Sequence, residues 1–102
     1  GLHEGKRLVS EASIDEMTKP HTAGGKVQNY GLGWQCNLPE KAIVPGFSAN
    51  SFGHGGAYAT NGWIDPERRL VAVFLVQNVL VKDGGQSRQA FHGKIVGDLK
   101  KP

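Results

Sequence analysis

The residues best suited to chemistry lie in the segment Gly53-His54-Gly55-Gly56-Ala57. Glycines on both sides of a histidine let the backbone come within contact distance of a ligand, and exposed N–H groups there can stabilise an oxyanion. The imidazole can donate a hydrogen bond or, when protonated, place a positive charge near a substrate carboxylate. The same pattern also fits a glycine-rich strand end with a surface histidine, and spacing alone leaves both interpretations open.

A β-hairpin is expected to position this segment. Residues 60–64 and the apolar run 70–76 are separated by Asp65-Pro66-Glu67-Arg68, a turn sequence in which proline stands where its fixed φ is favourable. The second arm is apolar on both faces, which predicts a central strand covered on each side rather than an edge strand.

A third strand is expected over residues 30–36, because Tyr30, Leu32, Trp34 and Cys36 alternate with small or polar residues and would share one face. Residues 1–7 and 37–50 are polar or rich in turn residues, and both are expected to be loops. Trp34 and Trp63 are interpreted as core aromatics rather than as a ligand platform.

Two helices are expected to pack on these strands. The first has Ser10 as its N-cap and Glu11 in its first turn, and Pro20 stops it soon after Lys19. The second has Ser87 as its N-cap. Its apolar stripe would consist of Ala90, Phe91, Ile95 and Leu99, and the spacing of Gly93 and Gly97 would let it lie close to a sheet.

Three strands and two helices predict an α+β fold with an antiparallel sheet. A chain of 102 residues holds one domain at most. Three strands are few for a sheet with a two-sided central strand. We therefore expect residues 1–102 to form a single partial domain whose sheet continues outside them.

Composition argues against several other classes of protein. The net charge is only +3, and the basic residues are scattered rather than gathered in a stripe with aromatics, so nucleic-acid binding is not favoured. The longest apolar run is far shorter than the roughly 20 residues that a membrane span needs. No cofactor motif is present, and His3, His21, His54, His92 and Cys36 lack the regular spacing of a zinc site, so neither a cofactor nor a metal is expected. The sequence assigns no cellular compartment.

Four segments in order resemble the C-terminal part of the serine β-lactamase and penicillin-binding-protein superfamily, in its class C-like and esterase branch. They are residues 8–18, the motif Tyr30-Gly31-Leu32-Gly33-Trp34, the segment Phe52-Gly53-His54-Gly55-Gly56-Ala57, and residues 61–73. The resemblance covers most of the chain and implies a fragment of the β-lactamase fold with hydrolase activity toward an ester, an amide or a β-lactam.

The resemblance also implies roles for individual residues. The triplet His54-Gly55-Gly56 is similar in position to the family's Lys-Thr-Gly, so His54 would take the place of the lysine, and the Ala57 N–H would complete the oxyanion hole. Gly55, Gly56 and Tyr58 would contact substrate. Histidine in place of lysine and glycine in place of threonine favour an esterase or peptidase-like member over a true β-lactamase.

The family's nucleophile is absent from these 102 residues. No serine is followed three residues later by lysine, and there is no Gly-x-Ser-x-Gly motif. We therefore expect a C-terminal segment that partners the N-terminal remainder of the same enzyme, acts on a small ester or amide only in that context, and is inactive alone. Two alternatives stay open: a non-catalytic peptide- or glycan-binding module of the same fold, and an autonomous small basic protein.

Overall fold

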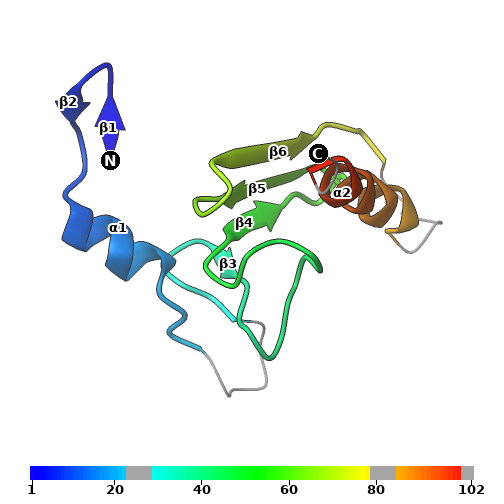
Figure 1. Cartoon of the computed structure of the whole chain (residues 1–102), viewed down its shortest axis with the longest axis horizontal. Coiled ribbons are helices and arrows are strands. Elements are labelled where there is room, and N and C mark those ends of the chain that lie inside the picture. The colour runs from blue at the N-terminus through cyan, green and yellow to red at the C-terminus, as the bar shows by residue number, and fades with distance from the viewer. Residues whose placement is uncertain (23–28, 79–84, 100–102) are drawn as a thin grey trace.

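The computed structural model describes residues 1–22, 29–78 and 85–99, and it has two helices and antiparallel sheets (Figure 1). This confirms the predicted α+β class. In chain order the elements are β1 (Leu2–His3), β2 (Lys6–Arg7), α1 (Glu11–Thr18), β3 (Gln35–Cys36), β4 (Phe52–Gly55), β5 (Asn61–Asp65), β6 (Leu70–Phe74) and α2 (Gln86–Leu99).

The main sheet has the strand order β3-β4-β5-β6, and every neighbouring pair is antiparallel. The predicted hairpin is confirmed as β5 and β6, which pair from Asp65↔Leu70 to Asn61↔Phe74. Arg69 closes the turn between them in the left-handed region, at φ 54°. The glycine segment extends this hairpin as a further strand, β4, where the sequence predicted only a strand end.

The prediction that the second arm is a covered central strand is wrong for the part of the chain that the structure describes. Strand β6 is the last strand in the sheet order, and Val71 and Val73 are 64% and 52% exposed. Its apolar residues alternate between a covered and an uncovered face, so a continuous apolar run did not guarantee burial on both sides.

Strand register defines the two faces of the sheet, because directly paired residues project to the same side. Gly53, Trp63 and Ala72 form one row across β4, β5 and β6. We call the side of this row the inner face. The next row, made of His54, Gly62 and Val73, projects to the opposite side, which we call the outer face.

The hydrophobic core lies between the inner face and α2. Its buried members are Val44, Phe47, Trp63 and Ala72, and Phe91, Ile95 and Val96 of α2 pack against them. Trp63 is fully buried and its indole N–H donates to Ser51 Oγ at 3.0 Å, which confirms its expected place in the core. Trp34 is only half-buried and meets the Phe52 ring edge-on.

Helix α2 differs from its prediction in detail. It begins at Gln86, so Ser87 lies inside the helix rather than at its N-cap. Its buried side is made of Phe91, His92, Ile95 and Val96, while Ala90 and Leu99 are exposed. Gly93 and Gly97 are not close-packing positions, because a Cβ on either would meet nothing within 4 Å.

The predicted strand 30–36 is wrong in its first half. Tyr30 pairs with Gln35 in an isolated antiparallel bridge, and the Gly31 N–H donates to the Trp34 carbonyl at 2.8 Å. Gly33, at φ 84°, turns the chain between them. Glycines that left one face bare therefore marked a tight turn, and only Gln35–Cys36 remains as strand β3.

Strands β1 and β2 lie away from the main sheet in Figure 1, whereas the C-terminal end of α1 reaches β3, where the Cys36 thiol donates to the Thr18 carbonyl at 3.2 Å. Helix α1 confirms the predicted cap, since Ser10 Oγ accepts from the Ser13 N–H and the helix ends at Thr18. Residues 1–7 are not a simple loop: β1 and β2 pair through a turn at Glu4 and Gly5, both of which have positive φ. Such φ values are typical of the turns that close two-residue hairpins.

Candidate functional site

The segment that the sequence singles out, residues 53–57, forms the end of strand β4 and the start of the turn that follows it. His54 lies on the outer face of β4 and is exposed, whereas Gly55 belongs to the inner-face row of Asn61 and Phe74. The side chains of consecutive strand residues alternate between faces. The segment can therefore present an imidazole on one side and bare backbone on the other.

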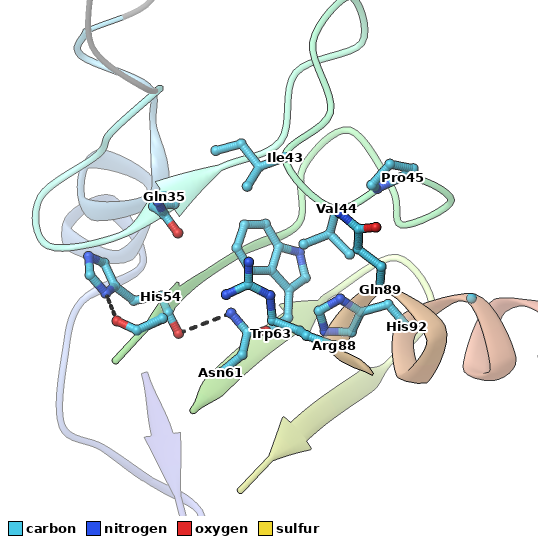
Figure 2. Close-up of a pocket in the computed structure, with 12 residues that line it drawn as sticks. Gln35, Ile43, Val44, Pro45, His54, Asn61, Trp63, Arg88, Gln89 and His92 are labelled. Carbon is cyan, nitrogen blue, oxygen red and sulfur yellow. Dashed lines mark hydrogen bonds between the residues drawn. The ribbon is translucent and has the colours of Figure 1, made fainter. Parts of the chain in front are cut away.

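Two hydrogen bonds hold the His54 imidazole. Nδ1 lies 2.5 Å from the Gly55 carbonyl oxygen, and Nε2 lies 3.1 Å from the Tyr30 hydroxyl. A carbonyl oxygen only accepts, so Nδ1 carries the proton. In the neutral ring Nε2 is therefore the acceptor, and Tyr30 donates to it. Figure 2 shows the contact from the His54 ring to the adjacent carbonyl.

Beyond β4 the chain makes a tight turn in which the N–H groups of Ala57 and Tyr58 donate no hydrogen bond within the described part of the chain. Gly56 N–H donates to the Thr60 carbonyl at 2.8 Å, and Ala59 N–H donates to the Gly56 carbonyl at 3.1 Å. Ala57 lies between them, and its N–H donates no hydrogen bond within the described part of the chain. An unpaired amide at a strand end can stabilise a developing negative charge on a ligand.

A side chain would be crowded at Gly56 but not at Gly55. A Cβ on Gly56 would stand 2.2 Å from Thr60 Oγ1, whereas one on Gly55 would meet only ordinary contacts at 3.6 Å and beyond. Tyr58 follows in the same turn with a side chain that is 52% exposed. Its carbonyl accepts from Asn78 N–H at 3.1 Å, which ties the turn to the chain that follows β6.

A pocket of about 640 Å³ opens between the inner face and α2, with His54 and Gly55 at one end. Figure 2 shows Asn61, Arg88 and His92 around it, together with the Trp63 indole. Among the described residues that line it there is no carboxylate, and the Arg88 guanidinium gives this lining a positive character. Such a pocket suits a ligand that carries a negative or strongly polar group.

Two buried polar side chains in this pocket have unsatisfied atoms. His92 and Asn61 are 5% and 6% exposed, and His92 Nε2 and Asn61 Oδ1 have no hydrogen-bond partner among residues 1–22, 29–78 and 85–99. Burial lowers the pKa of His92 below its ordinary value, and the charge of Arg88 lowers it further, so both influences favour the neutral ring. A polar ligand group or a water could satisfy both atoms, because buried polar groups usually find partners.

The structure brings together residues that sequence reasoning did not connect. Tyr30 reaches His54 across 24 positions, and Arg88 and His92 come from α2. The glycines of Tyr30-Gly31-Leu32-Gly33-Trp34 were the available signal, since a turn there returns the chain to the sheet. In the described ranges no three His, Cys, Asp or Glu side chains gather in a way that could hold a metal ion. Neither α1 nor α2 has the length and apolar character of a membrane span.

Comparison with known proteins gives one family match. The family model described as Beta-lactamase matches residues 1–91 of the 102. No curated protein and no solved structure matches the chain. The match includes β4, the turn after it and the first turns of α2, so it spans the residues of the pocket up to Phe91.

Proposed function

The chain belongs to the beta-lactamase family, and from this premise we propose that it forms one wall of the active site of a serine hydrolase. The proposed reaction is cleavage of an ester or amide bond through a serine acyl-enzyme. The substrate is a small molecule, and the branch is the class C-like and esterase branch. His54-Gly55-Gly56 takes the place of the family's Lys-Thr-Gly triplet in this proposal.

The observation that supports the proposal best is the outer-face row of His54, Gly62 and Val73, which the described part of the chain leaves uncovered. His54 is exposed, a Cβ on Gly62 would meet nothing within 4 Å, and Val73 is 52% exposed. These three residues are paired neighbours across β4, β5 and β6. An apolar and histidine-bearing surface of this kind is expected where a second wall packs and leaves a cleft.

Each residue of the turn has a distinct role in the proposed site. The Ala57 N–H is the oxyanion donor, and Gly56 keeps its backbone free of a side chain that would strike Thr60. Gly55 admits the substrate backbone, and exposed Tyr58 contacts the part of the substrate outside the scissile bond. His54 lines the cleft with its imidazole.

The attacking serine is proposed to come from the N-terminal remainder of the same enzyme. No Ser-x-x-Lys motif occurs in these 102 residues, so the acyl-enzyme step needs a nucleophile from outside them. We place the enzyme with the esterases because His54 donates its Nδ1 proton to Gly55 and accepts from Tyr30. Histidine in place of the family's lysine removes a permanent positive charge that could face a substrate carboxylate.

The proposal is tested by labelling the protein encoded by the complete reading frame with a fluorophosphonate. Labelling is expected on an upstream serine and on none of the serines of this chain. Ala57→Pro removes the oxyanion N–H and should slow labelling by about 10²–10³-fold. Ala57→Gly is the matched control, because it keeps the N–H, and its rate should stay close to that of the unchanged protein.

Two results would contradict the proposal. Labelling of a serine within residues 1–102 would show that the nucleophile lies in this chain. Equal rates for Ala57→Pro and Ala57→Gly, with both variants folded, would remove Ala57 from the oxyanion hole.

A second candidate function is supported by the pocket itself. Arg88 and the unsatisfied atoms of Asn61 and His92 form a polar, positively charged lining without needing a nucleophile. This arrangement suits a non-catalytic module that binds a peptide or a glycan. Complete absence of serine labelling in the full protein, together with saturable binding of such a ligand, would favour the module over the enzyme.

A further inference from the structure

The geometry points to a second reactive group: we propose that Tyr30 is an acyl-accepting nucleophile with His54 as its general base. The chemical class of its substrate is an activated ester, such as a nitrophenyl ester. Both residues lie in this chain, so the inference does not rest on the proposed serine hydrolase function.

The direction of the hydrogen bonds favours proton transfer from Tyr30. The Gly55 carbonyl fixes the proton of His54 on Nδ1, which leaves the Nε2 lone pair facing the Tyr30 hydroxyl at 3.1 Å. A nucleophile within hydrogen-bond reach of a base, with the base oriented by a third group, is the arrangement that activates hydroxyl nucleophiles. Here the third group is a backbone carbonyl, which no side-chain motion can withdraw.

The backbone holds Tyr30 in place for this contact. The Tyr30 N–H donates to Thr22 Oγ1 at 2.8 Å, and the Tyr30 carbonyl accepts from His21 N–H at 2.6 Å. These two hydrogen bonds fix the backbone of Tyr30. The bridge to Gln35 joins the same residue to the edge of the main sheet. The Tyr30 and His54 rings lie 5.7 Å apart at 56°, so they meet at the polar edges rather than stacking face to face.

The site is also open to a reagent. His54 is exposed and Tyr30 is only half-buried, so the contact between them is not enclosed by the fold. An ester can therefore approach the hydroxyl without a change in the fold.

The proposed step balances without any further reactant. The Tyr30 oxygen attacks the ester carbonyl carbon and forms a new C–O bond, while its proton moves to His54 Nε2. The bond from the carbonyl carbon to the nitrophenolate oxygen breaks, and nitrophenolate leaves with the electron pair. The imidazolium then returns its proton to water, and the product is acyl-Tyr30.

Tyr58 is a natural internal control. The chain contains two tyrosines, and Tyr58 is 52% exposed, so a reagent reaches it readily. It has no imidazole within hydrogen-bond distance among the described residues, and only its backbone carbonyl is engaged in a hydrogen bond. Exposure alone would make Tyr58 at least as reactive as Tyr30, whereas general-base activation would favour Tyr30.

The experiment exposes the 102-residue chain to nitrophenyl acetate and measures acetylation of each tyrosine by peptide mass spectrometry. Tyr30 is expected to acetylate at least about tenfold faster than Tyr58, since a positioned base contributes roughly 10²–10⁴-fold. In His54→Gln the Tyr30 rate should fall to that of Tyr58, while Tyr58 stays unchanged. In concentrated urea the two tyrosines should react at equal rates, because the pair no longer exists.

Three outcomes would overturn the inference. They are equal rates for the two tyrosines in the folded chain, a Tyr30 rate unchanged by His54→Gln, and a Tyr30 preference that persists in urea. The first and third need no variant, so the inference can be rejected even if His54→Gln does not fold. Circular dichroism establishes whether it does.

Discussion

At the residue scale, His54 illustrates what a sequence can and cannot predict. The glycines around it indicated an exposed imidazole at a strand, and the structure has an exposed imidazole there. Its partner Tyr30 could not be predicted, because the contact depends on a turn at Gly33 that the alternating pattern of residues 30–36 concealed. An exposed side chain on a strand can be predicted from the neighbouring residues, whereas a contact across 24 positions depends on strand register.

Asp65 is a second residue whose importance emerges only from long-range contacts. Its carboxylate is fully buried, and it accepts hydrogen bonds from the backbone and side chain of both Ser48 and Arg68. Burial, the largest single influence, acts to raise the pKa of Asp65, but these hydrogen bonds together outweigh it and the pKa lies below its ordinary value. The charged form is therefore the one that stabilises the fold.

We predict that Asp65 makes stability depend on acid pH. A carboxylate with a lowered pKa contributes stability that is fully present above its unfolded pKa of about 4 and is lost as the pH falls through its folded pKa. Asp65→Asn should lower the free energy of unfolding near neutral pH by about 1–3 kcal/mol. It should also flatten the loss of stability that the unchanged chain shows below about pH 4.

Urea unfolding between about pH 7 and about pH 2 measures both effects. Glu67→Gln is the matched control, because Glu67 is exposed in the same turn, and its profile should follow that of the unchanged chain. Identical acid profiles for Asp65→Asn and the unchanged chain would contradict the assigned role of this carboxylate.

At the element scale, signals confined to a few neighbouring residues were predictive, and signals that depend on packing were not. The Ser10 cap and the Asp65-Pro66 turn are short-range devices, and both formed as predicted. The buried side of α2 was misassigned, because His92 and Val96 lie toward the core instead of Ala90 and Leu99. A stripe of apolar residues sets a helix face only approximately, and the available partner surface decides the rest.

We predict that the same substitution has opposite effects on two elements. Gly93→Ala should raise the free energy of unfolding by about 1 kcal/mol, because Gly93 is an exposed helix interior position where a Cβ would meet nothing within 4 Å. Gly53→Ala should lower it by about 1–3 kcal/mol, because a Cβ there would stand 2.2 Å from the Gly62 carbonyl oxygen and 2.5 Å from the Trp63 ring. Thermal and urea unfolding of the two variants provide the measurement, and a shift of the same sign in both would contradict the packing described for β4 and β5.

At the scale of the whole molecule, the two faces of the main sheet are packed unequally in the described part of the chain. The inner face has α2 and a small core, whereas α1 buries no residue and the residues of β1 and β2 are exposed. The radius of gyration is 14.5 Å, against about 13 Å for a compact domain of 100 residues. The apolar run 70–76 had predicted cover on both faces, but Val71 and Val73 stay exposed in the part of the chain that the structure describes.

The last prediction concerns that open face. Val71 and Val73 project from β6 to the outer face, and exposed apolar strand residues bind hydrophobic dyes and promote association. Changing both to threonine should reduce the fluorescence of a bound naphthalene sulfonate dye at least about twofold, while the unfolding free energy changes by no more than about 0.5 kcal/mol, because threonine keeps a high β-propensity. Leu8→Thr is the matched control: Leu8 is 68% exposed but lies outside the sheet, so its loss should leave dye binding intact. If the double variant binds as much dye as the unchanged chain, the outer face of β6 is already covered in solution, and the second wall of the proposed cleft has no surface on which to pack.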